Sequence, residues 1–172
     1  MKFLRLKIIV ILFTFSASCE AQNINILSTT EFSQIRVSNY LLSSIKESNG
    51  SKQAIQNLLS NSYSYKEYNE PEMSKEYSDS LKNLKMLFED RMEAGNNYEL
   101  AFLEITGPQS TLTLKNKRIR VGDNISLLGA INTNRIDGRK VAFFQVPGRD
   151  ESFSIYTDSK GVISKIEYNL FN

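Results

Sequence analysis

The chain has 172 residues, of which 41% are hydrophobic and 23% are charged, a composition typical of a globular protein with an ordinary core. It contains no His and a single Cys, which excludes His-based proton transfer, Ser-His-Asp and Cys-His catalysis, and zinc sites built from Cys and His. The sequence has no glycine-rich phosphate-binding motif, and we expect neither a cofactor nor a metal.

The first residues have the pattern of a bacterial export signal. Lys2, Arg5 and Lys7 precede an apolar run over residues 8–15, and small residues follow at 16–19. The run is shorter than the roughly 20 apolar residues of a membrane span, and a buried strand would not explain the cationic start. We therefore predict a signal peptide over residues 1–21, followed by one exported domain over residues 22–172 that is periplasmic or secreted.

Two processing sites compete at the end of this segment. Cys19-Glu20-Ala21 places small residues at the −3 and −1 positions of a cut before Gln22. Ser16-Ala17-Ser18-Cys19 instead resembles a lipobox, in which Cys19 is lipidated and holds the protein at the outer membrane. Lipoboxes usually carry Leu where Ser16 stands, so we favour the cut before Gln22. We expect membrane association only if Cys19 is lipidated.

The charge balance changes when the signal is removed. Residues 1–21 contain three basic residues and one acidic residue, so 21 basic and 19 acidic residues become 18 of each, a net charge of zero. Bulk charge therefore does not indicate a nucleic-acid partner, and we expect none.

Helices are predicted for the first half of the domain. Ser28 and Glu31 match a capping box, and apolar residues recur at helical spacing from Phe32 to Ile45. Asn49-Gly50 is a typical end of a helix, and Ser51 can cap a second, short helix. The polar residues 60–69 are predicted to form a loop.

A third helix is predicted between Asn69 and residue 94. Its apolar residues form a single stripe at helical spacing. This stripe is most simply explained as core packing, and a helix that binds a partner is the alternative. The stripe consists of Met73, Tyr77, Leu81, Leu84, Phe88 and Met92.

The second half of the domain is predicted to be β-structure. Strands are expected over 98–105, 111–114, 118–121, 141–146, 152–157 and 162–168, with hairpin turns at 115–117 and 158–161. Residues 125–131 form a short helix or a loop. Helices over about 29–94 and strands over about 98–170 predict an α+β fold, with N-terminal helices packed on a C-terminal antiparallel β-sheet.

Two segments of this half resemble small bacterial envelope domains. Residues 119–129, Ile-Arg-Val-Gly-Asp-Asn-Ile-Ser-Leu-Leu-Gly, resemble their element of strand, Gly, short helix and Leu-Gly, and residues 155–166 resemble their final hairpin. The resemblance covers residues 111–170 and is to BamE-like and beta-lactamase-inhibitor-protein-like domains. It implies helices packed on a small antiparallel sheet and binding to other proteins, and it implies no functional residue.

Charge is distributed unevenly along the chain. Residues 66–104 carry five basic and ten acidic residues, a net charge of −5, whereas residues 115–149 carry eight basic and two acidic residues, a net charge of +6. Strand alternation places the side chains of Arg118 and Arg120 on the face opposite Ile119 and Val121. Either the acidic helix lies near the basic sheet and the charges compensate, or the basic side chains meet an acidic protein or an anionic envelope component. The candidate partner-binding residues are Arg118, Arg120, Arg135, Arg139 and Lys140.

Three classes of function remain. The first is a non-catalytic envelope protein that acts as a binding or assembly module for another protein, and we expect this one. The second is an inhibitor or immunity-type protein that masks an enzyme. The third is a carboxylate-based hydrolase, for which Glu89, Asp90 and Glu104 are candidates. Acidic residues on helices are usually solvated, which argues against the third class.

We predict that the exported protein begins at Gln22. The intact mass of protein recovered from the envelope or the medium measures this directly. A mass that includes a diacyl modification on Cys19 would contradict the prediction and place the protein on a membrane.

Overall fold

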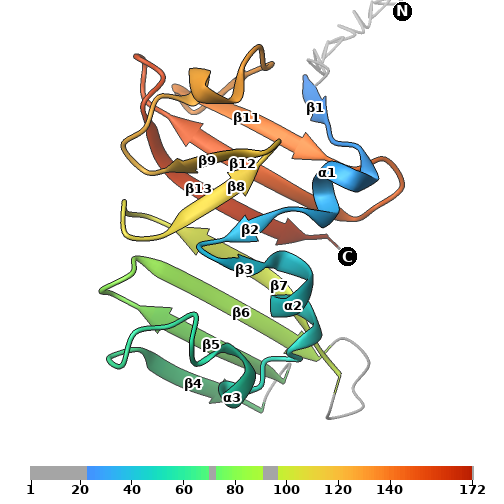
Figure 1. The fold of residues 1–172 in the computed structure, drawn as a ribbon, viewed down its shortest axis with the longest axis vertical. Coiled ribbons are helices and arrows are strands. Elements are labelled where there is room, and N and C mark those ends of the chain that lie inside the picture. Colours follow the sequence, from blue (N-terminus) through green and yellow to red (C-terminus); the bar gives the residue numbers. More distant parts are fainter. Residues whose placement is uncertain (1–22, 70–72, 91–96, 172) are drawn as a thin grey trace, which may run out of the picture.

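The computed structural model describes residues 23–69, 73–90 and 97–171, and these residues form mostly β-structure (Figure 1). Among them, nine strands make one large sheet in the order β1-β11-β12-β13-β7-β6-β5-β4, with β10 also paired to β11. Neighbouring strands are antiparallel except β1, which is parallel to β11. The strands are β1 (Ile24–Ile26), β4 (Ser64–Tyr68), β5 (Ser74–Asp79), β6 (Leu84–Asp90), β7 (Tyr98–Ile105), β10 (Asn134–Ile136), β11 (Arg139–Gln145), β12 (Glu151–Thr157) and β13 (Ile163–Leu170).

A small sheet and short helices cover one face of the large sheet (Figure 1). The small sheet has the order β3-β2-β8-β9, and all of its pairs are antiparallel. Its strands are β2 (Arg36–Val37), β3 (Tyr40–Leu41), β8 (Thr111–Leu114) and β9 (Lys117–Arg120). The helices are α1 (Thr29–Ser33), α2 (Leu42–Glu47), α3 (Lys52–Ile55) and the single 3-10 turn η1 (Ile125–Leu128).

The core lies between the large sheet and this covering layer. Along β6, Leu84, Met86 and Phe88 are buried, and the residues between them are only half-buried, so β6 has one inner and one outer face. Val37 and Ile119 of the small sheet are fully buried in the same apolar cluster. The two sheets and the helices therefore share a single hydrophobic core.

The predicted α+β fold with N-terminal helices is wrong, because residues 64–68, 74–79 and 84–90 form strands β4, β5 and β6. A spacing of four residues, as between Leu84 and Phe88, fits one face of a helix and also one face of a strand. The burial of Met86 together with Leu84 and Phe88 shows that every second residue is buried, which is the period of a strand and not of a helix. Leu81 of the predicted stripe is 61% exposed, in the turn between β5 and β6. Met92 of the predicted stripe lies outside the described residues.

The first predicted helix is much shorter than expected. The Ser28–Glu31 capping box is confirmed, but α1 ends at Ser33 and the chain reverses between β2 and β3 at Ser38, whose φ is +56°. Of the apolar residues that follow, Ile35 lies just before β2, and Leu42 and Ile45 belong to α2. Residues 60–69, predicted as a loop, contain β4.

Most of the second half agrees with the prediction, with one change of topology. The hairpin β8–β9 turns at Lys115 and Asn116, whose φ angles are +52° and +59°, and the hairpin of β12 and β13 is also confirmed. However, the strands of 98–170 do not form one sheet, because β8 pairs with β2 and β9 pairs with β8 in the small sheet. The signal segment, both processing sites and Cys19 lie outside the described residues.

A buried carboxylate fixes the turn between β5 and β6. Asp79 is 1% exposed and accepts hydrogen bonds from the backbone N–H and the hydroxyl of Ser60 and from the N–H groups of Leu81 and Lys82. Burial opposes ionisation, but these donors outweigh it, so the pKa of Asp79 lies below its ordinary value. The charged carboxylate thus joins the loop before β4 to this turn.

Replacing Met86 and Leu81 separately by Ala tests the strand assignment of β6. Met86→Ala should lower the free energy of unfolding by about 2–5 kcal/mol, because it leaves a cavity in the core. Leu81→Ala should change it by less than about 0.5 kcal/mol, because this side chain is exposed. Urea unfolding measures both values, and the reverse order would favour the helix.

Asp79→Asn should lower the free energy of unfolding at pH 7 by about 1–3 kcal/mol, because the buried donors lose a charged acceptor. The folded pKa of Asp79 is below the unfolded value of about 3.9, so its contribution is present above that pH and is lost as the pH falls through the folded pKa. The difference between the two proteins should therefore shrink below about pH 4. The exposed Asp137, changed to Asn, is the control, and an equal effect there would contradict this role.

Candidate functional site

Three arginines lie on the outer face of the small sheet. Arg36 of β2 is opposite Thr113 of β8, which is opposite Arg118 of β9, and Arg120 of β9 is opposite Thr111. Arg36, Arg118 and Arg120 are exposed. We call these three residues the arginine face.

The inward side chains of the same strands explain this orientation. Val37, Leu112 and Ile119 form the alternate row across the small sheet, and all are fully buried. Because successive side chains of a strand point to opposite faces, burying this row turns the arginines outward. The outward direction predicted for Arg118 and Arg120 is confirmed.

Local contacts position each guanidinium. Nη1 of Arg36 donates to the Asn39 carbonyl at 3.1 Å, and Nε of Arg118 donates to the Thr111 hydroxyl at 3.1 Å. Nε of Arg120 is 3.6 Å from Oδ1 of Asp123. Each of these contacts engages one nitrogen, whereas a guanidinium carries five N–H donors.

A shallow hollow of about 260 Å³ lies between the two arginines of β9. Thr111, Ile119 and Asp123 line it together with Arg118 and Arg120, so two cations face one carboxylate. The planar fork of Arg binds carboxylates and phosphates at two points. This part of the arginine face is therefore suited to an anionic group.

The remaining predicted basic residues lie on the large sheet. Arg135 of β10 is directly opposite Lys140 of β11, and Arg139 lies next to the turn of the same hairpin. Arg135 and Arg139 are exposed and Lys140 is half-buried. The structure thus divides the five predicted residues into a pair on β9 and a group of three on the β10–β11 hairpin.

Sequence reasoning missed Arg36. It was assigned to a helix, whereas it belongs to a two-residue strand that joins β8 across the small sheet. The local signal is the turn at Ser38 and Asn39 between β2 and β3. The partner strand is more than 70 residues away in the chain, and nothing local specifies that pairing.

The acidic and basic parts of the chain lie toward opposite ends of the molecule. The acidic residues 66–104 contribute β5, β6 and β7 and part of β4, and the basic residues 115–149 contribute β9, β10 and β11. In Figure 1, β4–β6 are at the bottom and β9 and β11 are in the upper half. In the large sheet, β12, β13 and β7 separate β11 from β6. Most of these charges are therefore separated along the longest axis, although Arg149 of the basic part lines a hollow together with Glu99 of the acidic part.

The acidic residues considered for hydrolysis do not form a facing pair. Glu89 and Asp90 are successive residues of β6 and so point to opposite faces. Glu104 is opposite Lys85, which is four residues before Glu89, so Glu89 and Glu104 are about 13 Å apart along the strand. Paired glycosidase carboxylates are about 5–9.5 Å apart. Glu104 also lies 4.0 Å from Lys165 on the outer face.

The two segments that resemble envelope domains lie against each other. The N–H of Gly122 donates to the Ile163 carbonyl at 2.8 Å, and the N–H of Ile125 donates to the Gly161 carbonyl at 2.9 Å. Compared with known protein families, curated proteins and solved structures, the chain matches none. The resemblance therefore stays a prediction.

Within residues 23–69, 73–90 and 97–171, no group of three or more Cys, Asp or Glu side chains is arranged to hold a metal ion. Over the same residues, none of the helices has the length and hydropathy that a membrane crossing requires.

Proposed function

We propose that this protein is a non-catalytic, exported binding module that holds an acidic partner protein on its arginine face. The observation that carries the proposal is the position of Arg36, Arg118 and Arg120 on one solvent-facing sheet surface. Their strands are fixed by a fully buried row beneath them. A rigid platform of this kind loses little conformational freedom on binding.

Several features favour a protein as the partner. The arginine face is open, so it can meet a surface or a loop that carries several carboxylates. Thr113 is half-buried and lies between Arg36 and Arg118 in the strand register, so it adds a neutral hydrogen-bonding group, whereas Thr111 is buried and its hydroxyl accepts from Arg118. The separation of charge along the molecule would orient an acidic partner toward this end as it approaches.

The predicted signal peptide places this interaction in the envelope or outside the cell. An inhibitor or immunity-type protein is the special case in which the partner is an enzyme. Both functions use the same surface, and the identity of the partner separates them.

The test compares the wild-type protein with two charge-reversed variants. In the first, Arg36, Arg118 and Arg120 are changed to Glu. In the second, Arg135 and Arg139 are changed to Glu as a matched control at the same end of the molecule. A partner captured from envelope extract by the wild-type protein is purified, and its affinity for each variant is measured at low and high salt.

We expect reversal of the arginine face to weaken binding by at least about tenfold, and high salt to weaken wild-type binding. The control variant should keep most of the affinity, and all three proteins should have similar melting temperatures. Unchanged binding by the first variant would contradict the proposal. Retention of an anionic glycan or phosphate polymer, with no acidic protein, would contradict the choice of partner.

A further inference from the structure

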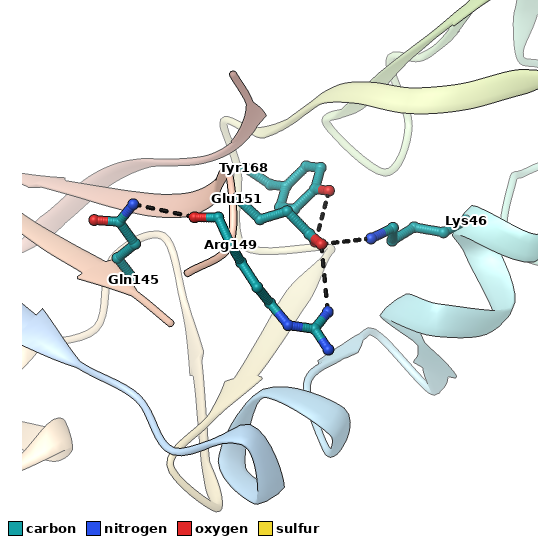
Figure 2. Close-up of polar contacts among 5 residues, drawn as sticks. All are labelled: Lys46, Gln145, Arg149, Glu151 and Tyr168. Carbon is teal, nitrogen blue, oxygen red and sulfur yellow. Dashed lines mark hydrogen bonds and ion pairs between the residues drawn. The ribbon is translucent and has the colours of Figure 1, made fainter. Parts of the chain in front are cut away.

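A buried carboxylate forms ion pairs with two cations in a cleft between α2 and the turn that joins β11 to β12 (Figure 2). Oε1 of Glu151 lies 2.8 Å from Nζ of Lys46 and 3.5 Å from Nη1 of Arg149. The Tyr168 hydroxyl donates to Oε2 at 3.0 Å. The Glu151 side chain is 8% exposed, whereas those of Lys46 and Arg149 are 28% and 44% exposed.

Within the cluster of Lys46, Arg149, Glu151 and Tyr168, two cations face one anion. A buried carboxylate needs compensation, and one cation together with the Tyr168 hydroxyl would already supply it. Here two cations serve one anion, and both reach the surface. Lys46 and Arg149 therefore both present charged N–H donors to the cleft, and Glu151 beneath them offsets one of their two positive charges.

The position of Arg149 is fixed from two sides. Its N–H donates to the Val146 carbonyl at 3.2 Å, and Nε2 of Gln145 donates to the Arg149 carbonyl at 3.2 Å (Figure 2). Its guanidinium carbon is 5.1 Å from the centre of the Phe32 ring, in a cation–π contact. The guanidinium thus stands at the edge of an apolar surface.

Lys46 and Arg149 border two hollows. The smaller, of about 240 Å³, lies between α1 and α2, and Phe32 and Leu42 form its apolar part. The larger, of about 390 Å³, lies toward β7 and the end of β13, and its lining includes Glu47, Glu99 and Asp150. Glu47 lines both hollows, so a hollow with an apolar part and a hollow with additional carboxylates meet at a pair of cations.

We propose that this cleft binds the C-terminal residue of a polypeptide. The terminal carboxylate lies between Lys46 and Arg149, and an apolar last side chain fills the hollow over Phe32 and Leu42. The preceding residues follow the larger hollow, where Glu47 and Asp150 favour backbone N–H donors and a basic side chain. The site is independent of the arginine face and does not depend on the proposed function.

Size and charge together select this ligand. Whole small-molecule ligands usually occupy pockets of about 300–1,000 Å³, whereas 240 Å³ is below this range and suits one side chain. The acidic lining of the larger hollow repels an anion. The negative group of the ligand therefore binds next to the two cations and not inside the larger hollow. A peptide that ends in a basic and then an apolar residue satisfies both conditions.

Fluorescence anisotropy with a labelled hexapeptide, Gly-Ser-Gly-Ser-Lys-Leu, tests the proposal on the full exported protein. Matched peptides end in the C-terminal amide, in Asp instead of Leu, or in Glu-Leu instead of Lys-Leu. We expect saturable binding of the free acid. The amide and the Asp peptide should bind at least about tenfold more weakly, and the Glu-Leu peptide should also bind more weakly.

Two variants separate binding from structure. Arg149→Gln should weaken binding of the peptide with a free C-terminal carboxylate by at least about tenfold. The melting temperature should change little, because Lys46 and Tyr168 still compensate the charge of Glu151. Glu151→Gln removes the competing anion and should bind the peptide at least as tightly as the wild type, although it lowers the melting temperature. A purely structural cluster instead predicts that Arg149→Gln leaves peptide binding unchanged, and this result would contradict the proposal.

The Arg118→Glu, Arg120→Glu double variant is the control and should bind the peptide like the wild type. Three results would overturn the proposal: no saturable binding at millimolar peptide, equal binding of acid and amide, or tighter binding of octanoate than of the peptide. The last would identify the ligand as a free fatty acid.

Discussion

The apolar inner face of the large sheet is the constraint on which the remaining structure depends. Tyr77, Phe88, Phe144, Phe153 and Tyr168 are among its largest fully buried side chains. The chain has one Cys, so no disulfide within it can reduce the conformational entropy that folding has to overcome. Burial of this face therefore has to supply most of the stability, and the face needs a continuous cover.

That cover also determines where charged side chains emerge. In the small sheet, each residue turned toward the core leaves its neighbours turned toward solvent, which is how Arg36 and Arg118 come to share one surface. At the edge of the large sheet where β12 begins, the same alternation turns a charged side chain inward instead of outward. Glu151 is two residues from Phe153 on the inner face of β12, so its carboxylate is buried and requires Lys46 from the covering layer.

The second half of the fold could be predicted from sequence because its signals are local. The β8–β9 turn and the β12–β13 hairpin are specified by residues adjacent in the chain. The first half could not, because Leu84 and Phe88 fit both periods and because β2 and β3 have two residues each. Pairings such as Ile24 with Phe143 depend on the whole core, and no short pattern encodes them.

The candidate sites also differ in how much of each could be predicted from local sequence. Arg118 and Arg120 could be placed on an outward face from alternation alone, whereas adding Arg36 required the pairing of β2 with β8. The Glu151 cluster could not be found at all, since Lys46, Arg149 and Tyr168 come from separate elements and the sequence contains no motif for them.

The two surfaces are linked by one stretch of chain, and its packing decides whether they influence each other. Residues 29–47 run from α1 through β2 and β3 to α2, so they carry Phe32 and Lys46 of the cleft and Arg36 of the arginine face. The N–H of Leu42 donates to the Ile35 carbonyl at 2.9 Å, which ties the start of α2 to the residue before β2. Ile35, Val37, Leu42 and Ile45 are all nearly or fully buried, so the stretch is anchored in the core on both sides of Arg36. A close-packed core resists small displacements, and a ligand at Lys46 would have to move this anchored segment to disturb the arginines. We therefore expect the two proposed sites to bind their ligands independently of each other.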